Sequence, residues 1–347
     1  MSASSFKSGP ASFAASHTYD VFNGDADGIC ALHQLRLANP KDAVLITGIK
    51  RDIRLLDRVP CDNPADVTVL DISLDANVVA LKRILEAGGQ VSYFDHHSAK
   101  QLFEHPHLHA FLDDSSDVCT SILVNRHLQG RYWQWAAVAA FGDNLLHVGN
   151  ILCRQHELNA FHTKALEELG LMLNYNAYGE KLEDLHIPPV SLYESLHEYL
   201  EPLDFVATAP QYRLLTEGYK EDESHMNNMT PEWSSAWGAI YILPCEPWAR
   251  RISGVLANKL ATRDAGKSFA VLTEKTDGSY LVSVRSGAPD IRSASGLCER
   301  FQGGGGRRSA AGINELPANE LGRFIDSFSR YFSIHVPAVA TGEAYGH

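Results

Sequence analysis

Four short motifs in the first half of the chain carry the side chains best suited to chemistry, and three of them lie where an apolar run ends. NGDADG, which contains Asp25 and Asp27, follows YDVF, and Asp71 closes VTVLD. FDHH closes VSYFDHH, and FGDN, which contains Asp143, follows an apolar run with helical spacing. Taken singly, NGDADG also fits a hairpin-like or Asx turn, a lone Asp after a strand fits a helix N-cap, and DHH fits a surface triplet. Taken together, they indicate carboxylates and imidazoles gathered at one place.

The elements around these motifs predict a parallel sheet. From His17 to about Gly149, short apolar runs typical of buried strands alternate with helical patterns such as 28–39 and 77–89. Alternation of this kind indicates βαβ units. Because parallel strands end at one edge of their sheet, the side chains of the first three motifs are expected to converge on one crevice.

Converging carboxylates would raise one another's pKa unless a cation neutralised them. Oxygen ligands mixed with imidazole suit Mn²⁺ or Mg²⁺ better than zinc, which prefers more His or Cys. The ligands are numerous enough for two ions about 3.5–4 Å apart, an arrangement that activates water and stabilises a phosphoryl-transfer transition state. The sequence therefore predicts a site for divalent metal, with Mn²⁺ as the expected ion and two as the expected number.

The second half of the chain predicts a smaller α/β domain. Helical patterns dominate from about residue 131 to 203, and a βαββα pattern follows a polar stretch. We expect a flexible leader over 1–17, a metal-binding domain with its helical connector over 18–216, a linker over 217–233, a substrate-binding domain over 234–335 and a tail over 336–347.

A glycine-arginine motif in this second domain is suited to phosphate. In GGGGRRSAAG, backbone without side chains at Gly304, Gly305 and Gly306 precedes Arg307 and Arg308, whose guanidinium groups match phosphate oxygens. Taken alone, such a run also fits a flexible surface loop.

Two further residues and the local charge support the phosphate interpretation. Arg285 and Ser286 close an apolar run and are expected at the mouth of the same pocket. Between Arg285 and Ile313, five arginines and two acidic residues give a local charge of +3.

Composition limits the classes of function. The chain has 30 Lys+Arg against 42 Asp+Glu, and a net charge of -12 argues against coating long nucleic acid. Its six cysteines are dispersed, without a CxxC pair, which is typical of reduced thiols in a cytoplasmic protein. No apolar run reaches the roughly 18 residues of a membrane span, and the N-terminus lacks a secretory pattern. We expect a short nucleic acid or dinucleotide as substrate, with no membrane and no long double-stranded DNA as partner.

In order and spacing, NGDADG, VTVLD, FDHH and FGDN resemble the four motifs of the DHH phosphoesterase family. The glycine run with RRSAAG resembles the signature of the family's associated C-terminal domain, so that the resemblance covers roughly residues 18 to 335. It implies an α/β fold with a parallel-sheet N-terminal DHH domain, a helical connector and a smaller α/β C-terminal domain. It also implies an active site in the interdomain cleft.

The resemblance implies a role for each matching metal ligand. Asp25 would bind one ion and Asp27 the other, and Asp71 would bridge the two. His96 and Asp143 would complete the coordination of the second ion.

The resemblance also implies two catalytic side chains and reveals three departures. Asp95 would orient a ligand imidazole, and His97 would face the scissile phosphate or contact a ligand. Many members carry His where this chain has Val21, and the RecJ-like exonuclease branch carries an acid where it has Asn23, a candidate neighbour of the first ion. Arg307 stands where the family has His, which makes the charge permanent.

The implied activity is a phosphodiesterase of the exonuclease or oligoribonuclease type, which hydrolyses short single-stranded oligonucleotides or linear dinucleotides by in-line attack of water. The sequence shows no extended basic stripe or aromatic platform, which favours short substrates. Hydrolysis of cyclic dinucleotides, a phosphatase acting on pAp and a non-catalytic nucleotide sensor stay open as alternatives. A homodimer is also left open.

Overall fold

The computed structural model describes residues 17–333, so the expected leader, apart from His17, and the expected tail lie outside the described part. The chain forms two compact units. The first contains residues 17–174 and 189–209, and the second contains residues 175–188 and 210–333. Each unit has its own sheet and its own buried apolar cluster.

The first unit is built on a five-stranded sheet in the order β2-β1-β3-β4-β5, in which every pair is parallel. The strands are β1 (His17–Phe22), β2 (Val44–Ile46), β3 (Ala65–Leu70), β4 (Gln90–Asp95) and β5 (Leu108–Leu112). The predicted parallel sheet is therefore confirmed. The sequence analysis did not include β5, whose short apolar sequence LHAFL is interrupted by His109 and follows a polar stretch.

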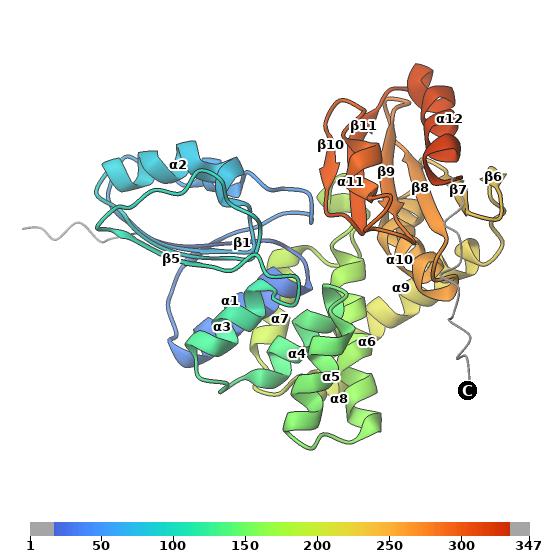
Figure 1. Ribbon diagram of the computed structural model, residues 1–347. Helices are drawn as coiled ribbons and strands as arrows, with labels where there is room; N and C mark the ends of the chain where they lie inside the picture. Colours follow the sequence, from blue (N-terminus) through green and yellow to red (C-terminus); the bar gives the residue numbers. More distant parts are fainter. Residues whose placement is uncertain (1–16, 334–347) are drawn as a thin grey trace, which may run out of the picture. The chain divides into compact units, whose positions relative to one another are not determined.

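Helices cover both faces of this sheet (Figure 1). They are α1 (Ala26–Ala38) and α3 (Thr120–His127) on one face and α2 (Leu74–Glu86) on the other. The crossover from β1 to β2 runs in the opposite direction to that from β3 to β4, and right-handed crossovers then put α1 and α2 on opposite faces. The strand order therefore reverses between β1 and β3, the point where sheets of this type bind ligands.

A buried ion pair fixes α1 on the sheet. Arg36 of α1 donates from Nε to Asp20 Oδ2 of β1 at 2.7 Å and from Nη2 to Thr68 Oγ1 of β3 at 3.0 Å. Arg36 Nη2 also contacts Asp20 Oδ1, and both charged side chains are buried. Because α1 starts directly after β1, this pair also fixes the turn between them.

Helices fill the chain between the two sheets, as the sequence predicts for residues 131–203. They are α4 (Trp133–Gly142), α5 (Leu146–Gln155), α6 (Ala160–Asn176), α7 (Pro189–His197), α8 (Pro202–Thr208) and α9 (Pro210–Met226), with short 3₁₀ turns at Leu55–Arg58 and Leu182–Asp184. α9 extends into the expected linker 217–233, because its buried residues recur at helical spacing within a mainly polar stretch. Among residues 17–333, no helix is both long and apolar enough to span a membrane.

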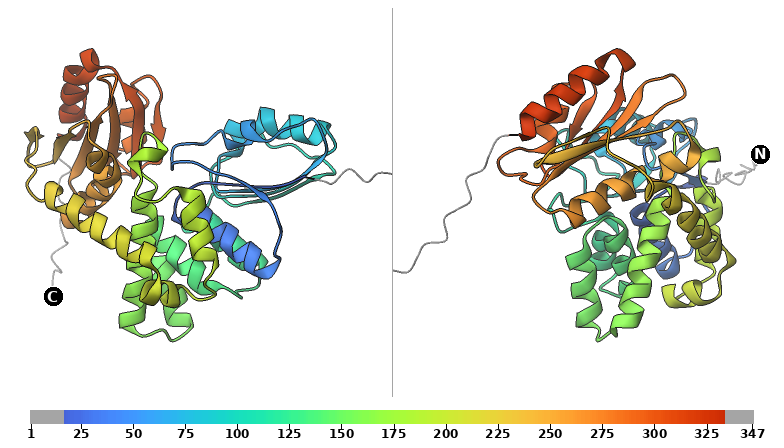
Figure 2. Two further views of the ribbon diagram at one scale, coloured as in Figure 1. Left: turned by 180° about the vertical axis from the view of Figure 1, so that it is seen from behind. Right: turned by 90° about the vertical axis from the view of Figure 1, so that its right-hand side faces the viewer.

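The second unit contains a six-stranded mixed sheet in the order β10-β11-β9-β8-β7-β6. Its elements are β6 (Trp233–Ser234), β7 (Gly238–Leu243), α10 (Pro247–Arg263), β8 (Ser268–Glu274), β9 (Tyr280–Arg285), α11 (Ala294–Cys298), β10 (Gly304–Gly306), β11 (Ala310–Leu316), a 3₁₀ turn (Ala318–Glu320) and α12 (Leu321–Phe332). β7 and β8 are parallel and the other pairs are antiparallel. Figure 2 shows α10 on one face of this sheet and α12 on the other.

A histidine pair on α1 and α7, of which His33 is buried and His197 half-buried, predicts sensitivity to acid. His33 is fully buried; its Nε2–H donates to the Tyr199 carbonyl at 3.1 Å, and its Nδ1 lies 3.0 Å from Nδ1 of His197. Burial, reinforced by His197, lowers the pKa of His33 from 6.5 to about 3. Between these pH values the unfolded chain binds the proton that the folded chain excludes. The free energy of unfolding should therefore fall as the pH falls, by up to about 1.4 kcal/mol per pH unit.

Urea unfolding between about pH 7 and pH 4 measures this slope. His33→Gln should make it shallower, whereas His109→Gln, at an exposed position of β5, should leave it unchanged. Equal slopes for His33→Gln and the wild type would contradict the assignment.

Candidate metal centre

In the turn between β1 and α1, backbone hydrogen bonds and close packing of the backbone fix the carboxylates of Asp25 and Asp27. Asp25 is the N-cap of α1, and its Oδ1 accepts hydrogen bonds from Asp27 N at 3.0 Å and Gly28 N at 3.1 Å. A Cβ atom at Gly28 would lie 2.2 Å from the Asn23 carbonyl oxygen, so this position requires glycine. NGDADG is therefore a capped strand-to-helix turn that orients two buried aspartates.

Asp71 follows β3 in an unusual backbone conformation. Its φ is 59°, in the left-handed region that residues other than glycine, asparagine and aspartate rarely adopt. Its N–H donates to the Phe94 carbonyl of β4 at 3.0 Å, and its Oδ1 accepts from Thr120 Oγ1 at 3.1 Å. The neighbouring strand and α3 thus hold the strained residue in place, with its carboxylate turned toward the other acidic side chains.

Asp27 is bound by the start of α3. Its Oδ2 accepts from Thr120 N and its Oδ1 from Ser121 N, each at 2.7 Å, and all three residues are buried. These are the first backbone N–H groups of a helix, which carry partial positive charge. The helix therefore fixes the orientation of the Asp27 carboxylate.

His96 is the centre of the cluster. Its Nε2 lies 3.4 Å from Asp71 Oδ1 and 3.9 Å from both Asp27 Oδ2 and Asp143 Oδ2. Its Nδ1 lies 3.0 Å from the Val118 carbonyl, which only accepts hydrogen bonds, so that Nδ1 carries the proton. In the neutral ring the Nε2 lone pair then faces three carboxylates, an arrangement that is stable only with a cation or a proton between them.

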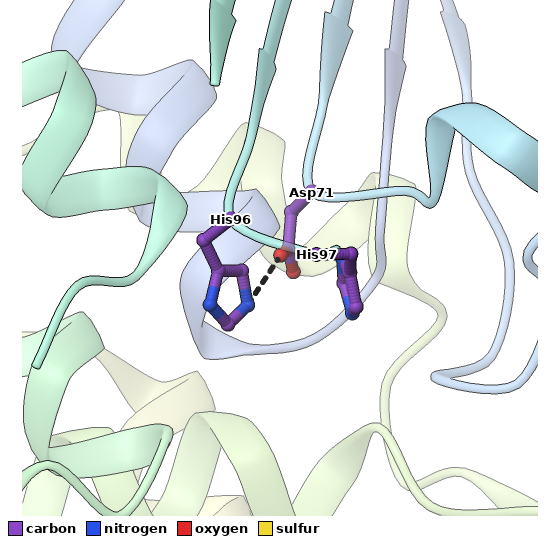
Figure 3. Close-up of side chains that lie close together, drawn as sticks. All are labelled: Asp71, His96 and His97. Atoms are coloured by element: carbon purple, nitrogen blue, oxygen red, sulfur yellow. Dashed lines mark ion pairs between the residues drawn. The ribbon is translucent and has the colours of Figure 1, made fainter. Parts of the chain in front are cut away.

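His97 turns to the other side of Asp71 in the view of Figure 3. Ligand atoms of Asp71, His96 and His97 all lie within 4.8 Å of one another. His97 Nδ1 is 2.6 Å from Asp95 Oδ1; the Asp95 side chain is fully buried, whereas that of His97 is 43% exposed. The resemblance implies that Asp95 orients a ligand imidazole. In the structure its partner is His97, because the Val118 carbonyl already holds His96.

The pKa values of the cluster indicate unbalanced negative charge. Burial, reinforced by the charge of Asp71, raises the pKa of Asp27 to about 7. Burial, reinforced by Asp25, raises the pKa of Asp71, and burial also raises that of Asp143. Burial lowers the pKa of His96, but its hydrogen bond to Asp71 and the surrounding carboxylates outweigh this effect and raise it to about 10. Without a metal ion, protons supply the missing positive charge.

The predicted metal ligands thus fall into two groups. Asp27, Asp71, Asp143 and His96 converge within ion-pair distance of one nitrogen atom, and their oxygen and imidazole donors fit Mn²⁺ or Mg²⁺. Asp25 instead pairs with a lysine, Lys50, which lies 2.5 Å from its Oδ2.

Asn23, the candidate neighbour of a first ion, joins two segments of the backbone through hydrogen bonds of its side chain. Its Oδ1 accepts from Asp25 N at 3.2 Å, and its Nδ2 donates to the Lys50 carbonyl at 3.1 Å. Both polar atoms of the amide therefore have backbone partners.

Several residues that organise this site were not predicted from the sequence: Lys50, Val118, Thr120, Ser121 and Asn174. Lys50 was detectable, because it follows the run that forms β2 and so belongs to the same edge of the sheet. The others act through backbone groups or from distant helices, and no local pattern marks them.

The predicted phosphate-binding residues lie on the second unit. Gly304–Gly306 form β10, the edge strand that pairs with β11, and Arg307 and Arg308 follow in the exposed turn between the two strands. Arg308 donates to the Asp290 carbonyl at 2.9 Å. The glycine-arginine motif therefore forms part of a β-hairpin made by β10 and β11.

Two more of these residues close β9. Arg285 donates from Nε to Asn258 Oδ1 at 2.9 Å. The Ser286 hydroxyl donates to the Arg292 carbonyl at 2.5 Å and accepts from Ala288 N at 3.1 Å. Ser286 therefore shapes the loop after β9.

Together, the parallel sheet of order 2-1-3-4-5, the acidic cluster at its switch point and the mixed second sheet define a two-sheet α/β protein with a doubly wound first sheet. No protein-family model matches the sequence, and no curated protein is significantly similar to it.

Solved structures share the fold at low sequence identity. The chain superimposes on a manganese-bound exonuclease RecJ with a TM-score of 0.53 and 16% identity, over 92% of this chain and 91% of that one. For RecJ from Thermus thermophilus in complex with Mn²⁺ the values are 0.55 and 16%, over 91% of this chain and 52% of that one. For PggH, a pGpG-specific phosphodiesterase from Vibrio cholerae, they are 0.54 and 13%, over 89% and 97%. The likeness confirms the fold that the sequence motifs predict.

Proposed function

We propose that this protein is a divalent-cation-dependent phosphodiesterase that hydrolyses linear dinucleotides or short single-stranded oligonucleotides, with Mn²⁺ as the expected ion. The observation that carries the proposal is the position of His96, whose Nε2 faces the carboxylates of Asp27, Asp71 and Asp143 while Nδ1 is held by a carbonyl. When bound there, the ion would supply Lewis acidity, which activates water and offsets charge on a phosphate.

His97 is the side chain best suited to move a proton. Its hydrogen bond to the buried Asp95 outweighs burial and raises its pKa, so that the imidazolium is favoured. Nδ1–H stays with Asp95, and Nε2–H is then available to bind a phosphate oxygen or to protonate the leaving alkoxide. Asp95 fixes the ring orientation for this role.

Structural neighbours support a linear over a cyclic dinucleotide. PggH is described as specific for pGpG, a linear dinucleotide, and RecJ as an exonuclease, and both share the fold over about nine-tenths of this chain. A cytoplasmic location and action on short nucleic acid are parts of the proposal.

An assay of the purified full chain tests the proposal. Linear dinucleotide, cyclic dinucleotide, pAp and a longer single strand are incubated with Mn²⁺ or with EDTA. We expect Mn²⁺-dependent hydrolysis, fastest with the linear dinucleotide. Preferred hydrolysis of the cyclic dinucleotide or of pAp would replace the proposed substrate, and nucleotide binding without hydrolysis would make the protein a sensor.

Arg307 is proposed to bind the terminal phosphate. Arg307→Ala should raise KM for a 5′-phosphorylated dinucleotide about ten- to a hundredfold with little change in kcat, because one charged hydrogen bond contributes about 1.5–3 kcal/mol. Arg330→Ala, at an exposed position of α12, is the matched control. A dinucleotide without the 5′-phosphate should respond equally little to both substitutions. An unchanged KM for the phosphorylated substrate would rule out this role.

A further inference from the structure

The Asp25 carboxylate differs from the others in the cluster because its partner is the ammonium group of a lysine, Lys50, and not the imidazole of His96. Its Oδ1 accepts from the backbone N–H groups of Asp27 and Gly28, and its Oδ2 lies 2.5 Å from Lys50 Nζ. Burial acts to raise the pKa of Asp25, but the charge and hydrogen bond of Lys50 outweigh it and lower the pKa. The pKa of the neighbouring Asp71 is raised instead. A lysine thus neutralises one part of the site, whereas the other part depends on protons or on a cation.

Lys50 is held at both its ends. Its Nζ donates to Asn174 Oδ1 of α6 at 2.8 Å, and its carbonyl accepts from Asn23 Nδ2 at 3.1 Å. Asn174 and Asp25 are buried, and the Lys50 side chain is only 25% exposed. An exposed lysine samples many rotamers, whereas this ammonium is fixed between a carboxylate and an amide oxygen.

Among residues 17–333, Asp71 is an acidic neighbour of Asp25, and the other side chains beside Asp25 offer few ligands to a second ion. Val21 of β1 is aliphatic and fully buried. Both polar atoms of the Asn23 amide have backbone partners, and the Asn174 oxygen accepts from Lys50. Water can complete the coordination of Mn²⁺ or Mg²⁺, but the protein must still offer free carboxylate oxygen. Here one Asp25 oxygen accepts from backbone N–H groups and the other is paired with the Lys50 ammonium, which a second ion would have to displace.

We infer that this protein binds one divalent cation, between Asp27, Asp71, Asp143 and His96, and that the Lys50 ammonium takes the place of a second. The positive charge at the site is then +3, one from lysine and two from the ion, in place of the +4 of a two-ion centre. One consequence is that Mn²⁺ activates the enzyme along a single-site saturation curve. The inference depends on the proposed function in one respect only, which is that the protein binds a divalent cation.

Metal content tests the inference independently of activity. Purified full-length protein is equilibrated with Mn²⁺, and bound manganese per chain is measured by elemental analysis and by calorimetric titration. We expect one ion per wild-type chain. Asn23→Asp combined with Lys50→Ala removes the ammonium and adds a carboxylate, and should raise the number to two. Lys41→Ala, which removes an exposed lysine paired with Asp66, should leave it at one.

The measured number of ions separates this inference from the proposed hydrolysis. Two ions per wild-type chain would overturn the inference and leave the proposed hydrolysis intact, since turnover is measured on the same preparations. One ion in both the wild type and the folded double variant would overturn the replacing role of Lys50, and absence of bound manganese would overturn both proposals. If the double variant does not fold, Lys50→Met, which keeps the aliphatic stem, is measured in its place, and the wild-type count still decides.

Discussion

Asp71→Asn is expected to lower kcat by about a thousandfold or more while the protein stays folded. Asp71 contributes the oxygen nearest to His96 Nε2, at 3.4 Å, and its charge should be essential for holding a cation. Metal-ion catalysis contributes several kcal/mol to lowering the barrier, and about 4 kcal/mol corresponds to a thousandfold in rate. Asparagine is the informative replacement, because it keeps the size of the side chain and tolerates the left-handed backbone at this position.

The matched control is Asp66→Asn. Asp66 lies on the same strand, β3, but toward its amino end, where it pairs with Lys41 on the surface. Steady-state kinetics in excess Mn²⁺ should show wild-type rates for the control. Circular dichroism and thermal unfolding of both variants separate loss of catalysis from loss of fold. A rate for Asp71→Asn within tenfold of wild type would exclude the cation site described here.

Arg36→Met is expected to cost the first unit about 3–5 kcal/mol of unfolding free energy. The substitution leaves Asp20 buried in β1 without its partner, and removing one member of a buried ion pair usually costs this much. Chemical denaturation measures the loss. Lys41→Met, which breaks the exposed pair with Asp66, should change the free energy by less than about 1 kcal/mol.

A double variant isolates the cause of the destabilisation. Asp20→Asn combined with Arg36→Met removes both charges, so much of the lost free energy of unfolding should return. A double variant as unstable as Arg36→Met alone would show that packing of the arginine stem, rather than the unpaired charge, dominates.

The sheet and the convergence of its strand ends could be predicted from the sequence, because both depend on local patterns. Apolar runs marked β1, β3 and β4, and the topology of a parallel sheet then brings Asp27, Asp71 and His96 to one edge. The edge strand β5 left a weaker signal, since His109 interrupts its short apolar sequence LHAFL.

The partners of the candidate ligands could not be predicted in the same way. The tautomer of His96 depends on the Val118 carbonyl, and the orientation of Asp27 depends on two backbone N–H groups of α3. Backbone groups carry no sequence signature. The pairing of Lys50 with Asn174 joins residues that are 124 positions apart, so only the folded chain reveals it.

The scattered origin of the candidate ligands connects the cation to folding. Asp27 follows β1, His96 follows β4 and Asp143 ends α4, so the cluster exists only after these elements have assembled. An ion held this way binds the native chain and not the unfolded one. It then adds to thermodynamic stability by mass action, by about 2.7 kcal/mol at a free concentration one hundred times its dissociation constant. The acidic cluster, whose charges repel one another without a cation, would therefore make the ion-bound protein more resistant to unfolding. The divalent ion would bind only after the parallel sheet has assembled and would then link its strand ends.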